Sequence, residues 1–147
     1  NGVVYCGKGG KEMIVKATVE DLDQEIINAL ENWTNGDLRR AVNDAIEESA
    51  ATAAKELKKG GPYQERTGNY SEDWGHKLRK RQYSSVINTE EYTVYNKKHY
   101  QLTHLLENGH QSRNGGRVKA FSHIAPVAEL TEQLVISNIG KKVREII

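Results

Sequence analysis

The chain has 147 residues, of which 37% are hydrophobic and 28% charged, and its formal net charge is +1. These values fit one folded domain with a modest core, and they exclude a partner that is selected by strong overall charge. The single cysteine, Cys6, excludes an internal disulfide, and no apolar run is long enough to predict a membrane span.

The first twelve residues carry little structural pattern. Asn1–Glu12 contains four glycines, and the only methionine of the chain is Met13. We therefore expect Met13 to be the natural start and residues 1–12 to be a flexible leader or an added upstream segment. Residues 13–147 would then form a single domain. A native arm from an earlier start is the alternative, and the intact mass of the authentic protein would distinguish the two.

Apolar periodicity predicts the elements of the first half. Residues 13–19 are β-branched and alternate, which favours a short strand. Residues 20–32 change to three- and four-residue spacing, which predicts a helix. A longer amphipathic helix is expected from about Asp37 to Lys59, where Gly60-Gly61-Pro62 stops it.

Strand-type sequence follows that helix. A strand is expected over residues 74–82. Two further strands, Val86–Asn88 and Tyr92–Tyr95, flank Thr89–Glu91, which is predicted to be a hairpin loop. Strands that gather after a long helix favour an α+β fold with a small antiparallel sheet packed against the long helix and a C-terminal helix.

The last third is predicted to contain two helices separated by a loop. A short helix fits Tyr100–Asn108, with Leu102, Leu105 and Leu106 facing the core. Residues 111–119 have no apolar pattern and are expected to form an exposed, mobile loop. The final helix begins near Ala125, and its predicted buried stripe consists of Val127, Leu130, Leu134, Val135, Ile139, Val143 and Ile146.

No catalytic, metal-binding or cofactor-binding site is predicted. The chain has five histidines: His76, His99, His104, His110 and His123. None has the spacing of a zinc motif, and intervals of five and six residues do not place His99, His104 and His110 on one helix face. No serine lies in a GxSxG turn, and the adjacent acids of Glu47–Glu48 and of Glu90–Glu91 point in different directions.

One basic run, residues 76–81, is a candidate for contact with DNA. On a regular strand Lys77, Arg79 and Arg81 share a face, and such a row could contact DNA phosphates, for example in a lumen. A solvated or subunit-facing surface is the simpler interpretation, because no aromatic residue interrupts the run for base stacking. A second basic cluster consists of Arg113, Arg117 and Lys119.

Three stretches together resemble a known protein family. They are Pro62–Trp74, which contains Arg-Thr-Gly-Asn-Tyr and ends in tryptophan; Tyr95–His110; and His123–Val127. Their order and spacing are similar to the gp-ten-like tail-component family of the HK-ninety-seven type, which occurs in phages and prophages. The resemblance covers roughly Met13 to the C-terminus, and the middle stretch is its most specific part.

The resemblance implies a structural role in the virion rather than an enzymatic one. Family members are expected to act as head–tail connector or tail-completion proteins, assembled in the bacterial host cytoplasm. Sixfold symmetry is the expectation for a ring that continues a phage tail. The implied partners are further copies of the chain, the head connector or adaptor, and the tail tube or terminator proteins. The alternatives are a tail terminator that caps the tube and a small DNA-binding factor that uses the basic run.

This role would place a set of polar side chains at subunit or partner interfaces. The expected interface residues are Arg66, Tyr100, His104, Glu107, His110, Arg113, Arg117 and Lys119. Tyr100 and His104 are four residues apart and share a helix face. Arg66 is expected to pair with a carboxylate of the adjoining subunit, and residues 111–119 to become ordered only on assembly. Tyr70 and Trp74 are expected in the core or in sheet packing.

Overall fold

The computed structural model describes residues 4–6, 12–16, 23–31, 36–83 and 88–147 of the chain. Its elements are, in order, β1 (Val4–Cys6), β2 (Glu12–Val15), α1 (Gln24–Glu31), α2 (Gly36–Lys58), α3 (Asn69–Glu72), β3 (Trp74–Tyr83), β4 (Asn88–Asn96), α4 (Tyr100–Asn108), β5 (His110–Gln111), β6 (Arg117–Val118) and α5 (Ile124–Ile146). The predicted α+β class is confirmed.

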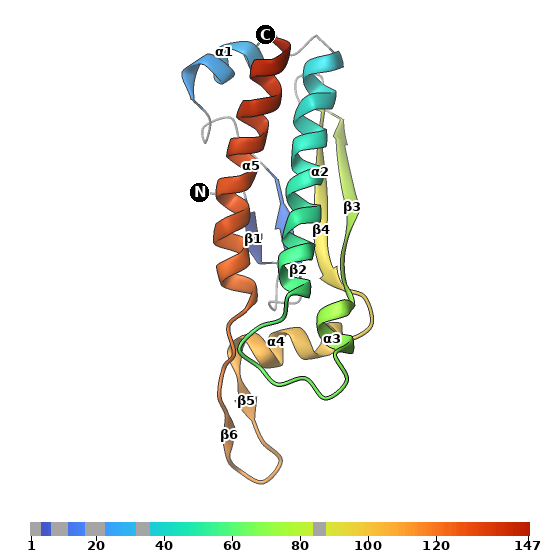
Figure 1. Cartoon of the computed structure of the whole chain (residues 1–147), viewed down its shortest axis with the longest axis vertical. Helices are drawn as coiled ribbons and strands as arrows, with labels where there is room; N and C mark the ends of the chain where they lie inside the picture. The colour runs from blue at the N-terminus through green and yellow to red at the C-terminus, as the bar shows by residue number, and fades with distance from the viewer. Residues whose placement is uncertain (1–3, 7–11, 17–22, 32–35, 84–87) are drawn as a thin grey trace.

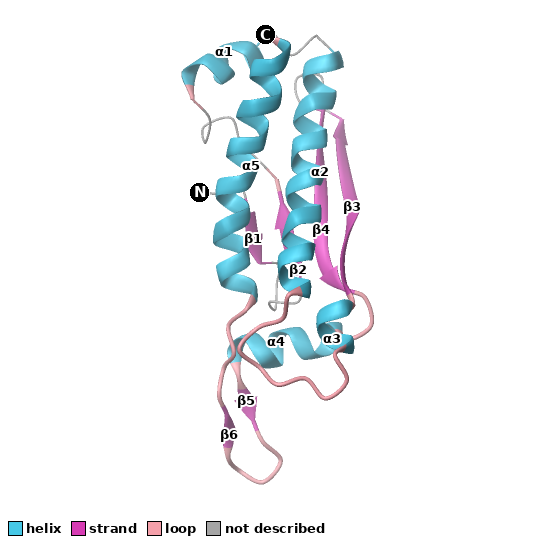
Figure 2. Ribbon diagram, in the orientation of Figure 1, coloured by secondary structure: helices cyan, strands magenta, loops and turns pink. Residues whose placement is uncertain are grey.

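Two long helices cover one face of an antiparallel sheet. The sheet has the strand order β1-β2-β4-β3, and each neighbouring pair is antiparallel. Helices α2 and α5 lie side by side along the strands (Figures 1 and 2), with α2 against β3 and β4 and α5 against β1 and β2. The body is therefore elongated.

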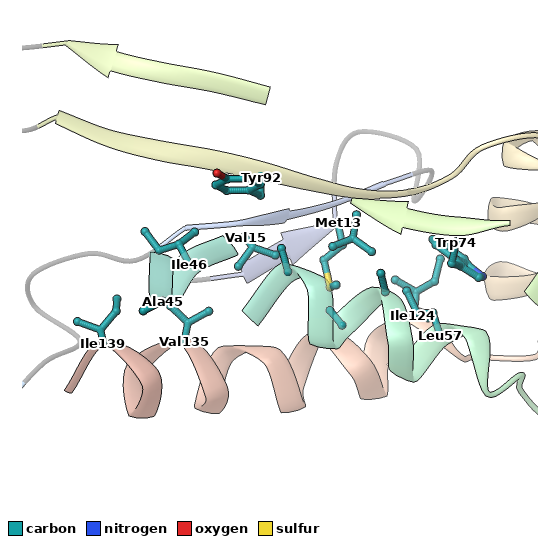
Figure 3. Close-up of a cluster of buried hydrophobic side chains, with 14 of the residues drawn as sticks. Met13, Val15, Ala45, Ile46, Leu57, Trp74, Tyr92, Ile124, Val135 and Ile139 are labelled. Atoms are coloured by element: carbon teal, nitrogen blue, oxygen red, sulfur yellow. The ribbon is translucent and has the colours of Figure 1, made fainter. Parts of the chain in front are cut away.

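The hydrophobic core lies between this helix pair and the sheet (Figure 3). Met13 and Val15 come from β2, Ile46 from α2, and Val135 and Ile139 from α5, and all five side chains are almost completely buried. Alanines on the inner face of α2 allow the neighbouring helix and the sheet to approach closely. Burial of each large aliphatic side chain stabilises the fold by roughly 1.5–3 kcal/mol.

The helices agree with the predicted apolar spacing, with differences at their ends. Helix α1 is shorter than predicted, and Asp23 Oδ1 accepts a hydrogen bond from Ile26 N at 3.1 Å at its start. Residues 20–22, in the predicted first turn, lie outside the described residues. Along α5, two residues assigned to the buried stripe, Leu130 and Ile146, are instead 41% and 42% exposed.

The prediction of a hairpin loop at Thr89–Glu91 is wrong. These residues belong to β4, which pairs with β3 along its whole length, while residues 84–87 lie outside the described part of the chain. Glu90 stands opposite Arg81, and Glu91 stands opposite Lys80. Cross-strand pairs of opposite charge stabilise a sheet, so two consecutive acids are compatible with a strand here.

Residues 4–6, which belong to the predicted flexible leader, form a strand. Val4–Cys6 forms β1 and pairs with Met13–Val15 of β2, so backbone hydrogen bonds hold this segment at the edge of the sheet. The predicted strand over residues 13–19 corresponds to β2, which ends at Val15. The natural start at Met13 stays a prediction.

Candidate interaction surface

An apolar groove lies at the end of the body where α2 stops and α4 crosses (Figure 1). We call it the α4 groove; it encloses about 590 Å³ between the loop after α2 and one side of α4. Its lining residues are Tyr63, Gln64, Glu65, Arg66, Thr67, Tyr70, His99, Leu102, Leu105, Leu106 and His110. The leucines and tyrosines form an apolar floor, and the polar side chains come mainly from the loop.

A buried asparagine holds α4 in place beside this loop. Asn96 is fully buried at the end of β4, and its Nδ2 donates to Tyr70 O at 2.7 Å. Its Oδ1 accepts from His99 N at 2.8 Å, just before the first turn of α4. The His99 ring is held in turn by Asp73, whose Oδ2 lies 2.8 Å from Nδ1. The orientation of α4 therefore depends on hydrogen bonds that join its start to the end of β4 and to the segment from Tyr70 to Asp73.

An aromatic cluster forms the back of the groove. The rings of Tyr63 and Tyr70 meet edge to face at 5.3 Å, and those of Tyr70 and Trp74 at 5.9 Å. Tyr70 Oη lies 2.8 Å from His123 Nε2. Burial, with a smaller contribution from Glu65, raises the pKa of Tyr63 to about 12, and burial also raises the pKa of Tyr70 well above its usual range. Both hydroxyls therefore stay protonated near neutral pH.

Glu107, at the end of α4, caps the start of α5. Its carboxylate accepts hydrogen bonds from the backbone N–H groups of His123, Ile124 and Ala125 at 2.8, 2.9 and 3.0 Å. Ser122 Oγ donates to it at 2.9 Å. A carboxylate at a helix N-terminus satisfies free N–H donors and opposes the helix dipole. Glu107 thus couples the groove helix to the second long helix of the body.

The electrostatics of Glu107 follow from these contacts. Burial alone would raise its pKa, but hydrogen bonds from the His123 side chain and from the three backbone N–H groups outweigh burial. The pKa of Glu107 therefore lies well below its usual range. The side chain is only 10% exposed, and the interface role predicted for this residue stays a prediction. The sequence contained a signal that was missed. Ser122 lies two residues before Ile124, and the residue directly before Ile124 is not Ser, Thr, Asp or Asn, so the start of α5 needs a hydrogen-bond acceptor from elsewhere in the chain.

Gly109 allows the chain to cross from α4 into the next strand. It has φ +70°, and an added Cβ would lie 2.6 Å from Val118 O. We expect Gly109→Ala to lower the free energy of unfolding by about 3 kcal/mol, because left-handed strain and a backbone clash add together. Gly115→Ala is the matched control: φ is +83° there, but no atom lies within 4 Å of the added Cβ. Urea denaturation of both variants would measure the difference, and equal losses would contradict the clash.

The segment predicted as a mobile loop forms a small β-hairpin instead. β5 and β6 pair antiparallel, Ser112 N donates to Gly116 O at 2.7 Å, and Gly115 N donates to Ser112 O at 3.2 Å. These local bonds close the turn within the chain itself, and the prediction that the segment orders only on assembly stays a prediction. The hairpin projects from the end of the body (Figure 1). Its exposed cations are Arg113, Arg117 and Lys119.

Comparison with known proteins assigns the chain to a family. The family model described as "Bacteriophage HK97-gp10, putative tail-component" matches residues 24–109, more than half of the chain. The chain belongs to this family. No curated protein and no solved structure matches it. A tail component is a virion protein, and the matched range contains the loop after α2 and α4, which line the α4 groove, but not His110, β6 or α5.

The structure places several predicted interface residues of this tail-family protein around the α4 groove. Arg66 and His110 line it, and Tyr100 is 48% exposed on α4. His104 is half-buried, and its Nδ1, like that of His110, has no hydrogen-bond partner among the described residues. Leu102 was predicted to face the core but is 42% exposed and lines the groove. The interface role of these residues stays a prediction.

The predicted row of Lys77, Arg79 and Arg81 is broken by a bulge. The register of β3 against β4 shifts between Leu78 and Lys80, so β3 has one extra residue there. Because side chains alternate between the two faces of a strand, this insertion moves Arg81 out of line with Lys77. The three cations therefore do not form the single face that the alternation predicted.

Two cations of this run also have acidic partners in β4. Arg81 Nε lies 3.1 Å from Glu90 Oε1, and Arg79 Nη1 lies 4.0 Å from Glu91 Oε2. Contacts with DNA phosphates would compete with these ion pairs. The basic run is therefore better explained as cross-strand pairing within the tail protein.

Neither metal chemistry nor a membrane span is indicated in the described part of the chain. No group of three or more His, Cys, Asp or Glu residues is arranged there to hold a metal ion. No helix described by the structure is long and apolar enough to cross a bilayer. The α4 groove and the cationic hairpin beside it are the features on which the proposed function is based.

Proposed function

We propose that the chain is a ring-forming head–tail connector or tail-completion protein that joins the capsid connector to the tail tube. One observation carries this proposal: the hairpin of β5 and β6 projects from the end of the elongated body at which α4 lies (Figure 1), and the apolar groove is lined by α4. Large apolar surfaces on a soluble protein mark binding sites for other proteins. Membership of a tail-component family makes other virion proteins the natural partners.

A ring at the junction of head and tail needs contacts between its own copies and contacts with the proteins above and below it. The chain has a candidate surface for each. Copies within a ring contact each other through two different surfaces that repeat around the ring. The virion proteins above and below the ring contact the segments that project from its two faces. We assign the α4 groove to contacts between copies and the hairpin to an adjoining virion protein with an acidic surface. A ring of six copies is our proposal, since the tail that the ring continues is expected to be sixfold.

Two cations of the hairpin, Arg113 and Arg117, suit contact with a neighbour, whereas Lys119 Nζ lies 5.7 Å from the centre of the Phe121 ring. Among the described residues, Arg113 and Arg117 form no salt bridge, and both side chains are exposed. Exposed cations of this kind steer association with an acidic surface and fix its register.

Phage that lack this protein provide the test. We expect full heads and complete tails that fail to join, visible by negative-stain electron microscopy, and loss of infectivity. Supplying the wild-type chain should restore joined particles. Overlong tail tubes would instead identify a tail terminator, and normal infective particles would contradict both roles.

A further inference from the structure

An exposed apolar residue lies on the outer side of α5, close to the start of the helix. Leu130 is 41% exposed, although most apolar side chains of α5 are buried or half-buried. Pro126, Glu129 and Gln133 are also exposed and follow one another at intervals of three and four residues along the helix. We call these four residues the α5 patch. It presents one large apolar side chain beside one carboxylate.

The α4 groove offers the complementary chemistry. Leu102 and Leu105 provide an apolar floor, and Arg66 adds an exposed cation at the rim. Neither Arg66 nor Glu129 has an ion-pair partner among the residues that the structure describes. The hairpin of another copy is a poor occupant for the groove, because Arg113 and Arg117 would be brought toward Arg66.

Ring symmetry adds a condition on position. A rotation axis keeps every point of a copy at constant height, so two surfaces that meet in a ring lie at the same level of the body. If the ring axis runs parallel to the long axis of the body, the surface that fills the α4 groove must lie at the same end of the body as the groove. Helix α5 begins beside α4 (Figure 1), whereas Ile146 and Ile147 lie at the opposite end. The α5 patch therefore meets the condition better than the C-terminal isoleucines do.

We propose that the α5 patch of one copy docks into the α4 groove of a second copy. Leu130 then packs on Leu102 and Leu105, and Glu129 pairs with Arg66 of the neighbour. The contact is heterologous, so each copy uses one surface toward each neighbour, and repetition closes a ring. This inference rests on the proposed ring function and names the residues through which the ring forms.

Charge reversal and its rescue provide the central test. Sedimentation velocity of the full chain is expected to show a ring-sized species for the wild type. Leu130→Glu and Arg66→Glu should each weaken association by about 30-fold or more. Combining Arg66→Glu with Glu129→Arg should restore association, because the pair is then reversed. Lys141→Glu, an exposed change further along α5, is the matched control and should leave the ring intact. Circular dichroism would verify that each variant is folded.

A mixing experiment tests whether two different surfaces meet. A groove variant carrying Arg66→Glu and Leu102→Glu retains the α5 patch, and the Leu130→Glu variant retains the groove. Each alone should be monomeric, and an equimolar mixture should form dimers but nothing larger. Rings formed by Leu130→Glu alone, failure of the reversed pair to associate, or a wild-type chain that stays monomeric up to its solubility limit would each overturn the proposal.

These outcomes are separable from the proposed function. If phage lacking the protein still join heads to tails, while the isolated chain forms rings that Leu130→Glu abolishes, the neck role fails and the contact stands. If joining is lost without the protein but Leu130→Glu still supports rings and infective particles, the contact fails and the neck role stands.

Discussion

Replacing Glu107 with alanine is expected to lower the free energy of unfolding by about 3 kcal/mol. The carboxylate accepts from three successive backbone N–H groups, those of His123, Ile124 and Ala125. Alanine would leave these donors without their acceptor at a largely buried helix end. Unfolding also separates α4 from α5, so the loss should appear in urea denaturation as a lower midpoint with an unchanged slope.

The same contact predicts sensitivity to acid. The hydrogen bonds hold the pKa of Glu107 below its value of 4.5 in an unfolded chain. The stabilisation is therefore fully present above pH 4.5 and is lost as the pH falls below it toward the folded-state pKa. Glu107→Gln keeps one acceptor but does not titrate. The stability difference between wild type and Glu107→Gln should be constant well above pH 4.5 and shrink below it.

Glu129→Ala is the matched control for this effect. Glu129 is also an acid near the start of α5, but it is exposed and has no hydrogen bond among the described residues. Measured in the Leu130→Glu background, in which contacts between copies are removed, its replacement is expected to change the free energy of unfolding by less than about 0.5 kcal/mol. Similar effects of Glu107→Ala and Glu129→Ala would show that the cap contributes little to stability.

The helices of this fold could be predicted from the sequence because their signal is local. Apolar residues recur every three or four positions along α2 and α5, and those same residues face the sheet. Gly60, with φ +90°, follows α2 where the sequence predicted its end. What periodicity alone did not reveal is the exposure of Leu130, because a position on the edge of a stripe faces the core or solvent depending on neighbouring elements.

The strand predictions failed for two reasons. Some strands are stabilised by partners that are distant in sequence, and others are held by backbone hydrogen bonds, which leave no apolar pattern in the sequence. Glu90 and Glu91 suggested a loop because acids disfavour strands, yet β3 supplies their opposite charges. The bulge after Leu78 depends on the register between two strands and is invisible in either strand alone. The β5–β6 hairpin is closed by Gly115 and Gly116, which suggested mobility instead.

The candidate site was only partly predictable for the same reason. The groove forms where the loop after α2 meets α4, segments about forty residues apart that Asn96 and the aromatic cluster bring together. Arg66 and Tyr100 were selected for their exposed, polar or aromatic character, which the sequence can suggest. Glu107 was selected on the same grounds, and its capping contacts were missed because their partners lie 16 to 18 residues further along the chain.

Replacing Trp74 with alanine is expected to lower the free energy of unfolding by about 4 kcal/mol. The side chain is 1% exposed and packs edge to face against Tyr70 at 5.9 Å and His123 at 6.2 Å. Its removal leaves a cavity behind Tyr63 and Tyr70, both of which line the α4 groove. Partial collapse of these rings into the cavity should also weaken association between copies, measured by sedimentation velocity at a temperature where the variant stays folded.

Trp74→Phe distinguishes packing from hydrogen bonding at this position. Trp74 Nε1 is buried and has no hydrogen-bond partner among the described residues, so its removal relieves an unsatisfied donor while most of the ring volume is kept. The expected cost is about 1 kcal/mol, well below that of alanine. If phenylalanine is as destabilising as alanine, the indole N–H makes a contact that outweighs packing. If alanine destabilises the fold but leaves association unchanged, the aromatic cluster supports the body and the groove keeps its shape through Asn96 and α4 alone.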